Sequence, residues 1–391
     1  MAKEIMLRYG MNPHQKPARV FVTQGELPVE VVSGAPGFIN MLDALNAWAL
    51  VKELKQALGL PAAASFKHVS PAGAAIAAPL SDAEKKALFV DDMADLSPLA
   101  IAYARARGAD RMSSFGDLAA LSDPLDASAA ELLAREVSDG CIAPGYDADA
   151  LEVLRSKRGG KYLALKIDPN FEPPALETRQ VYGIYLEQAR NVVVPGPDLC
   201  KTIVTKNKDL PPEAVRDLLV ATVALKYTMS NSVAFAKNGQ AIGIGAGQQS
   251  RVHCTRLAGS KADLWWLRQH PRVLAARFKD GVSRAERNNA IDQYLLEHPT
   301  PFEKRACREA FVKAPRPLTF KERSEWLAQL TGVSLSSDAF FPFRDSIDRA
   351  AQSGVKYVLQ PGGSERDDMV IQACDEHGMV MAMSGLRLFH H

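Results

Sequence analysis

Short runs of apolar, β-type residues alternate with longer stretches whose apolar residues recur at helical spacing along most of the chain. The stretch 43–58 keeps apolar residues three and four positions apart, and Gly59 follows it, which predicts a helix. The run 61–69 predicts a buried strand, and the turn-forming residues at 70–73 are expected to end it. Such an alternation is typical of an α/β protein.

The pattern recurs in the second half of the chain, which indicates a second α/β unit. Prolines precede a predicted helix at 214–227. A predicted strand at 241–245 leads through a glycine-rich turn into a helix that carries Arg251. Further strands are predicted at 340–343 and 357–359.

Two features qualify this division into units. Between 262 and 329, charged amphipathic helices follow one another with little strand propensity, so we interpret this stretch as a helical insertion in which Trp265 and Trp266 offer apolar surface. The segments 113–117 and 139–145 are also echoed by 336–340 and 357–362. Two copies of one unit would explain this echo, and chance matching of small residues is the alternative.

Composition limits the classes of protein to consider. The 391 residues are 47% hydrophobic and 24% charged, enough for a large core in about two or three domains. The net charge of +2 lacks the basic excess of a nucleic-acid binder, and no apolar stretch has the roughly 18 residues of a membrane span. The five cysteines are dispersed, which disfavours a disulfide framework and a thiolate zinc site. We therefore expect a cytoplasmic protein without nucleic-acid or membrane partners.

Lys67 and His68 are the first candidates for chemistry, because they stand where the predicted strand meets a turn. A histidine with an ordinary pKa of about 6.5 can act as a general base near neutral pH. Both side chains can serve one site only if the strand ends there, since neighbouring side chains of a strand point to opposite faces. A structural histidine bonded to the backbone is the alternative.

Two further segments have both a functional and a structural interpretation. The glycines of 243–247, followed by Arg251, could let backbone N–H groups approach an anion, or could simply form a tight strand-to-helix turn. Their spacing fits neither a P-loop nor a Rossmann motif. The aromatic segment 340–345, which ends in a carboxylate, could wall a planar heterocycle or could be an ordinary core strand.

Taken in order, these segments closely resemble the AICAR formyltransferase portion of the bifunctional purine-biosynthesis enzymes, AICAR transformylase/IMP cyclohydrolase. The likeness runs from Leu7 to His391. It rests on 7–15 (LRYGMNPHQ), 34–40, 65–75 (SFKHVSPAGAA), 111–117 (RMSSFGD), 230–232, 237–251 (KNGQAIGIGAGQQSR), 340–345 and 386–391.

The resemblance implies two cytidine-deaminase-like α/β units in tandem with a helical insertion. We place the first unit at 1–175, the second at 176–261 and 330–391, and the insertion at 262–329. The H-x-E and P-C-x-x-C zinc ligands of deaminases are absent, since Val69 and Ser70 follow His68, so we expect the fold without a zinc site.

The resemblance also implies roles for individual residues. His68 is expected to be the proton acceptor and Lys67 to stabilise the transition state. Residues expected to bind AICAR are Arg8, Tyr9, Asn40, Gly116, Asp139, Asn231, Arg251, Phe340 and Arg387. Residues expected to face the folate are Val252, Asp345, Ser364 and Glu365, with backbone contacts at Val252 and Glu365. Positions where some members hold potassium are Thr228, Ser230, Ser232 and Asp338.

The expected reaction passes the formyl group of 10-formyltetrahydrofolate to the 5-amino group of AICAR, giving formyl-AICAR and tetrahydrofolate on the route to IMP. The family implies a homodimer with shared active sites. Only six residues precede Leu7, so we expect a stand-alone transformylase, or that half alone, that depends on a separate IMP cyclohydrolase. Two alternatives stay open: a formyltransferase that uses formate and ATP, and a catalytically silent folate- or nucleotide-binding subunit.

Overall fold

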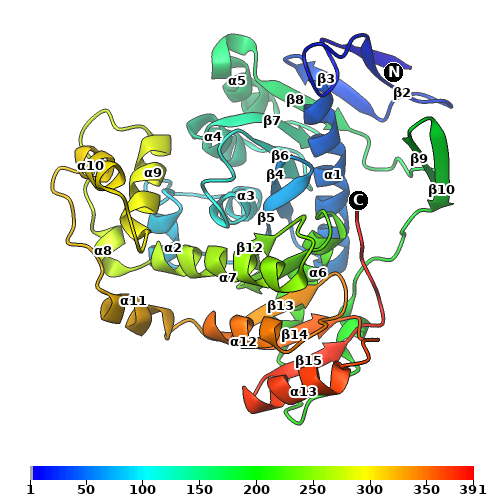
Figure 1. Cartoon of the computed structure of the whole chain (residues 1–391). Coiled ribbons are helices and arrows are strands. Elements are labelled where there is room, and N and C mark those ends of the chain that lie inside the picture. The colour runs from blue at the N-terminus through cyan, green and yellow to red at the C-terminus, as the bar shows by residue number, and fades with distance from the viewer. Residues whose placement is uncertain (1–2) are drawn as a thin grey trace.

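The computed structural model describes residues 3–391, so the first two residues of the predicted first unit lie outside the described part. The α/β class predicted from the sequence is confirmed, because helices cover both faces of one large sheet (Figure 1). Strands in the first half are β3 (Val29–Ser33), β4 (Ala62–Lys67), β5 (Ser70–Ile76), β6 (Asp117–Leu121), β7 (Ser138–Ala143) and β8 (Leu163–Ile167). Helices there are α1 (Phe38–Leu58), α2 (Asp82–Ala87), α3 (Pro98–Gly108), α4 (Ala127–Arg135) and α5 (Ala148–Ser156), with a short 3-10 turn at Lys157–Gly160.

The second half repeats these elements. Its strands are β11 (Val233–Lys237), β12 (Gln240–Gly245), β13 (Val333–Ser337), β14 (Val355–Gln360) and β15 (Val380–Met383). Its helices are α6 (Pro212–Lys226), α7 (Arg251–Leu267), α12 (Asp345–Gln352) and α13 (Asp367–Glu376), and a 3-10 turn at Pro197–Cys200 precedes them.

The sheet shows that the chain contains the same α/β unit twice. Its eleven strands run in the order β15-β14-β13-β11-β12-β5-β4-β6-β7-β8-β3. In each half a β-hairpin (β4–β5 or β11–β12) pairs antiparallel with the next strand, and two parallel strands follow. The halves meet where β5 pairs antiparallel with β12, with Ala75 opposite Gln240.

The duplicated structure confirms only one of the two pairs of similar segments noted in the sequence. Segments 139–145 and 357–362 do correspond, since both cover the second of the parallel strands and the turn after it. The match of 113–117 with 336–340 was wrong, because the first segment leads into β6 whereas the second follows the end of β13. Short small-residue motifs fit either end of a strand.

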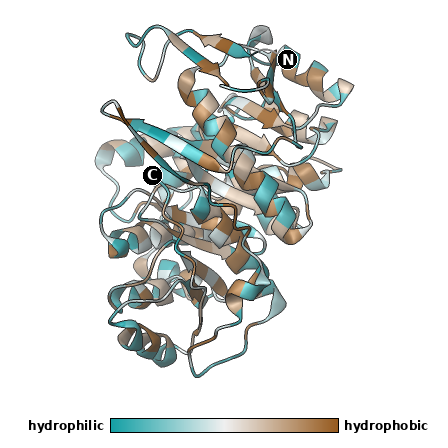
Figure 2. Cartoon of the chain, turned by 90° about the vertical axis from the view of Figure 1, so that its right-hand side faces the viewer, coloured by the Kyte–Doolittle hydropathy of each residue, from teal (hydrophilic) through white to brown (hydrophobic). Residues whose placement is uncertain are grey.

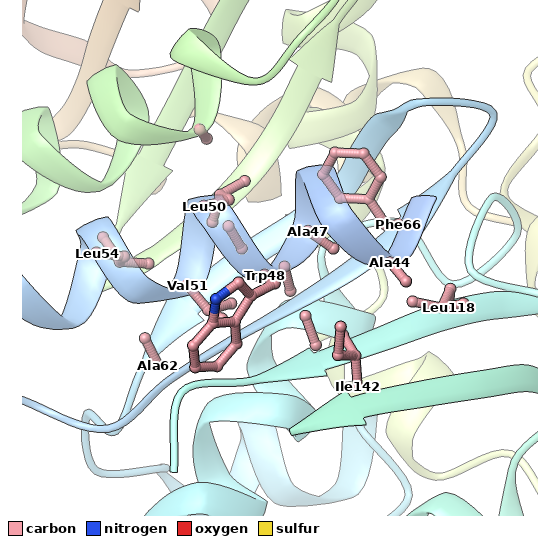
Figure 3. Packing of buried hydrophobic residues seen from close by; sticks show 14 of the residues in the cluster. Ala44, Ala47, Trp48, Leu50, Val51, Leu54, Ala62, Phe66, Leu118 and Ile142 are labelled. Atoms are coloured by element: carbon pink, nitrogen blue, oxygen red, sulfur yellow. The ribbon is translucent and has the colours of Figure 1, made fainter. Parts of the chain in front are cut away.

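Two helices lie at the centre of one face of the sheet, where α1 packs against α6. Ala44, Ala47, Val51 and Leu54 of α1 recur at helical spacing and are fully buried against β4, β6 and β7 (Figure 3). The opposite face is covered by α3, α4 and α5 in the first half and by α7, α12 and α13 in the second. The sheet is therefore buried on both faces, as parallel strands require.

Glycine allows the same close packing of a helix on the sheet in both halves. A Cβ atom on Gly73 of β5 would lie 2.1 Å from the carbonyl oxygen of Ala106 in α3. A Cβ atom on Gly243 of β12 would lie 2.1 Å from the carbonyl oxygen of Ala258 in α7. Each glycine is the fourth residue of its strand, so the two contacts are equivalent.

Three predicted elements differ from the structure. Helix α1 begins at Phe38 rather than 43, because Gly37 and Asn40 form its N-terminal cap. The residues at 70–73 do not end a strand but begin β5, since Pro71 lies beside a register irregularity that tolerates its missing N–H. Residues 340–343 are not a strand, because β13 ends at Ser337 and Pro342 cannot donate to a ladder.

The helices between the two parts of the second half begin at S/T-x-x-E capping boxes or at prolines. They are α8 (Pro271–Leu274), α9 (Arg284–Leu295), α10 (Pro301–Ala310) and α11 (Phe320–Leu327). The apolar surface predicted at Trp265 and Trp266 is not available: Trp265 is buried, and Trp266 stacks on Trp326 with ring centroids 5.2 Å apart. In the described part, no helix has the length and apolar character of a membrane span.

Two small sheets lie outside the main one. Strands β1 (Glu4–Leu7) and β2 (Ala18–Phe21) pair near the N-terminus. Strands β9 (Leu176–Val181) and β10 (Ile184–Ala189) pair only with each other, and every residue of both is exposed. This hairpin stands away from the main sheet in Figure 1, and Figure 2 shows apolar residues along it.

Glu136 connects the first half to the inserted helices. Its carboxylate contacts Arg107, Arg111 and, at 2.6 Å, the guanidinium of Arg284 from α9. Burial raises the pKa of Glu136, but these three cations outweigh that effect and hold its pKa far below the ordinary value. The stability that Glu136 contributes is therefore present above pH 4–5 and is lost as the pH falls further.

We predict that Glu136→Gln lowers the free energy of unfolding at pH 7 by about 3–5 kcal/mol, because it leaves buried guanidinium groups without their counter-ion. The loss should shrink as the pH falls below about 4, because Glu136 of the unfolded wild type then takes up a proton and the stability gained from its charge declines. Urea unfolding at several pH values measures both effects. Glu131→Gln, which breaks an exposed pair with Arg135, is the control and should cost at most about 1 kcal/mol. Equal losses for the two variants would contradict the prediction.

Candidate functional site

A cavity of about 300 Å³ lies where β4 ends and where β6 and β7 begin. Lys67 and His68 both line it, and β4 ends at Lys67, as the use of both side chains in one site would require. Other predicted site residues that line this cavity are Arg8, Tyr9, Asn40, Gly116 and Asp139. Together with Lys67 and His68, these residues come from five separate segments, so only the tertiary fold brings them together.

The turn between β4 and β5 explains how adjacent residues reach one cavity. Lys67 pairs with Ser70 as the last rung of the hairpin, so His68 and Val69 form a two-residue loop. Their φ angles are 54° and 60°, the left-handed conformation that hairpin loops of type I′ need. The Lys67 ammonium donates a hydrogen bond to the carbonyl of Phe115, beside Gly116. The chain direction thus reverses at His68.

Sequence analysis missed one residue of this cavity, Asp43 of α1. Its side chain is 5% exposed, and its Oδ1 accepts a 2.7 Å hydrogen bond from the backbone N–H of Val69. Burial raises the pKa of Asp43, while the hydrogen bond from Val69 and the neighbouring His68 oppose that shift. A carboxylate inside an otherwise apolar helical face was the signal in the sequence.

Other groups also line the cavity. Gly116 has φ 75°, and a Cβ atom there would lie 3.8 Å from the Asp139 carboxylate. Asp139 accepts a 2.9 Å hydrogen bond from Arg158 at the surface. Asn40 accepts the N–H of Gly37 at 2.9 Å, which fixes its side chain at the start of α1. The cavity lining thus combines acidic and amide groups with the cation of Lys67.

A second group of predicted residues gathers around Asp338, at the end of β13. Arg251 forms an ion pair with its carboxylate and donates a 2.8 Å hydrogen bond to Oδ1 of Asn231. Ser230 and Ser232 donate their hydroxyls to Asp338 at 2.7 and 3.0 Å. We call this group the Asp338 cluster, and protein groups already partner its charged side chains.

The C-terminal segment lies against the Asp338 cluster. The N–H of Leu388 donates to the carbonyl of Asp338 at 2.8 Å, and that of His390 donates to the Ser230 hydroxyl at 3.0 Å. Arg387, directly before Leu388, lies over the ring of Phe389, with its guanidinium carbon 4.8 Å from the ring centroid. Phe340, two residues after Asp338, keeps 41% of its surface exposed.

The residues expected to face the folate lie on the second half. Val252 is in the first turn of α7, Asp345 begins α12, and Ser364 and Glu365 precede α13. The N–H of Ser364 donates to Asp367 at 3.1 Å. None of the four lines the cavity at His68.

The cavity and the Asp338 cluster lie along the same edge of the sheet. The antiparallel pairing of β5 and β12 brings the start of β5 and the end of β12 to one edge. The N–H of Met229 donates to the hydroxyl of Ser70 at 3.3 Å, which links the two regions directly. No residue of the Asp338 cluster, however, is among those that line the cavity.

The Asp338 cluster fits a potassium ion only in part. Serine and threonine hydroxyls and a carboxylate are oxygen ligands of the type that hard cations take. Arg251 already neutralises Asp338, however, and Thr228 donates its hydroxyl to the Ala224 carbonyl at 2.7 Å. We therefore derive no step through such an ion. Among residues 3–391, no group of three or more His, Cys, Asp or Glu side chains is placed to hold a metal.

Comparisons with known proteins agree on one family. The family model described as "AICARFT/IMPCHase bienzyme" matches residues 1–261. Similar curated proteins include the "Bifunctional purine biosynthesis protein PurH" of Roseobacter denitrificans, 33% identical over 98% of this chain and 59% of that protein. The proteins of the same name from Cereibacter sphaeroides and Ruegeria sp. are 33% and 32% identical over the same shares. The chain thus spans about three fifths of the length of these relatives.

The glycines at 243–247 can be tested against their two interpretations. Gly243 and Gly245 approach the backbone of α7 so closely that packing alone explains them. We predict that Gly243→Ala lowers the free energy of unfolding by about 1–3 kcal/mol or more, because its Cβ would overlap backbone atoms. Gly196→Ala is the control, since that Cβ would meet nothing within 4 Å. Thermal unfolding of both variants checks this prediction. If Gly243→Ala is as stable as the wild type, packing does not explain Gly243 and the anion-site interpretation stays open.

Proposed function

The chain belongs to the AICARFT/IMPCHase bienzyme family, and we propose that it carries the formyltransferase activity of that family. In this proposal the formyl group of 10-formyltetrahydrofolate passes to the 5-amino group of AICAR, giving formyl-AICAR and tetrahydrofolate in purine (IMP) biosynthesis. The observation that carries the proposal is the cavity in which Lys67 and His68 meet Arg8, Tyr9 and Asn40.

The proposed chemistry assigns His68 the role of general base. The amino group of AICAR is conjugated with an imidazole that bears a carboxamide, so its lone pair is a poor nucleophile. It must lose a proton as the new N–C bond to the formyl carbon forms, and a neutral His68 can accept that proton. The bond from the formyl carbon to N10 of the folate then breaks, and N10 takes up a proton to give tetrahydrofolate.

Lys67 supplies the matching electrostatic stabilisation. The formyl oxygen gains negative charge in the tetrahedral intermediate, and a preplaced ammonium group stabilises that charge. Arg8 can pair with the nucleotide phosphate, since guanidinium groups match phosphate oxygens well.

We further propose that two copies of the chain form a homodimer with shared active sites. The resemblance assigns Asn231, Arg251, Phe340 and Arg387 to AICAR, yet the cavity of one copy is lined by none of them. The exposed β9–β10 hairpin is a suitable surface for a second copy. Val181, Ile184 and Leu186 lie on one face of it and are 51%, 63% and 58% exposed.

The assay that tests the function supplies purified protein with AICAR and 10-formyltetrahydrofolate and follows products by mass spectrometry. We expect tetrahydrofolate and formyl-AICAR, and conversion on to IMP when a separate cyclohydrolase is added. IMP formed at catalytic rates without that addition would contradict the expected dependence on a separate enzyme. Product formed only from formate and ATP would show another donor, and binding without turnover would show a silent subunit.

The same assay tests the two catalytic residues. His68→Ala should reduce turnover by about 10²-fold or more, the usual contribution of a positioned base, with AICAR binding nearly intact. Lys67→Gln should be impaired to a similar degree. His298→Ala, at an exposed histidine of the inserted helices, is the matched control. Near wild-type turnover of His68→Ala would remove His68 from its proposed role.

Light scattering tests the homodimer. We expect a dimer that Leu186→Asp converts to monomers with loss of activity, because a charge would be placed on the apolar face of the hairpin. Glu187→Gln, on the opposite face, should leave the dimer intact. A wild-type chain that is fully active as a monomer would contradict the proposed homodimer.

A further inference from the structure

The duplicated unit contains the His68 turn twice, and only one copy has the sequence that such a turn favours. The second copy is Asn238–Gly239, between β11 and β12, with φ 53° and 73°. Asn-Gly is the preferred pair for a type I′ hairpin loop. His68–Val69 has the same geometry, although a β-branched residue at φ 60° is strained.

A buried aspartate holds each of these turns. Asp217 of α6 accepts hydrogen bonds from the N–H groups of Asn238 and Gly239, at 2.9 and 2.6 Å. Asp43 of α1 accepts from Val69, the residue equivalent to Gly239, at 2.7 Å. The two carboxylates lie on equivalent helices and are 3% and 5% exposed. The repeated contact shows that it belongs to the architecture of the unit.

We propose that Asp43 is a positioning residue, which holds the strained His68–Val69 turn so that Lys67 and His68 face the same cavity. This rests on the proposed function. A hydrogen bond from an N–H group to a carboxylate is stronger than one between neutral groups, so it can offset the cost of the left-handed backbone. The second copy needs less help, because Asn238 and Gly239 adopt that conformation readily.

Two substitutions of Asp43 distinguish the effect of its hydrogen bond from the effect of its charge. Asp43→Ala removes the acceptor, so we expect kcat to fall by about tenfold or more as the turn leaves its geometry. Asp43→Asn keeps an acceptor oxygen and should retain kcat within about threefold of the wild type. If Asp43→Asn is as impaired as Asp43→Ala, charge rather than positioning is responsible and the proposal fails.

A double variant tests the turn itself. Glycine adopts positive φ without strain, so Val69→Gly in the Asp43→Ala background should recover most of the lost kcat. No recovery in a folded double variant, as judged by circular dichroism, would overturn the proposal. Asp217→Ala is the matched control in the second copy, and its kcat should stay at the wild-type level.

Amide hydrogen exchange provides a readout that does not depend on activity. The Val69 N–H should be protected in the wild type and in Asp43→Asn, and should exchange at least tenfold faster in Asp43→Ala. If exchange follows this pattern but the wild type transfers no formyl group, the proposed function fails and the structural role of Asp43 stands. If the wild type is active and Asp43→Ala matches it in kcat, the positioning role is refuted.

Discussion

The antiparallel pairing of β5 with β12 is the contact on which the rest of the structure depends. It turns two α/β units into one sheet, and Ile76 extends it by donating its N–H to the Gly239 carbonyl at 2.9 Å. Beside this pairing, the fully buried Arg105 donates a hydrogen bond to the side chain of Gln240 at 3.1 Å. Its counter-ion is Glu84, at 2.9 Å. A buried guanidinium with this many partners stabilises the junction, because leaving its N–H groups unpaired in the interior would be costly.

The orientation of this junction decides where the two hairpin turns lie. Because β5 and β12 run antiparallel, the turn at His68 and the loop before Arg251 come to the same edge of the sheet. The equivalent turn of the second unit, Asn238–Gly239, lies at the opposite edge. The two copies of the unit therefore differ at this turn. One hairpin turn places His68 at a cavity, while the other only connects β11 to β12, with a sequence suited to that conformation.

The copy that carries His68 departs from local preference, and the departure is supported from elsewhere in the fold. Val69 stands where glycine stands in the second unit, and the carboxylate of Asp43 compensates. Sites of function often contain such conflicts between local sequence and structure. The glycines at 243 and 245 show the opposite case, since a motif that suggested a ligand serves the packing of α7 on the sheet.

The sequence by itself determined the features that depend on neighbouring residues. Helical spacing and the prolines before it predicted α6, and the Lys67–His68 pair at a strand end pointed to the candidate site. Only the tertiary structure decided the features that join distant segments. Asp43 contacts Val69 across 26 positions, and Arg251 is paired with Asp338 across 87. Periodicity and local propensity report interactions within a few residues, whereas these contacts form because the packing of helices on a shared sheet brings separate segments together.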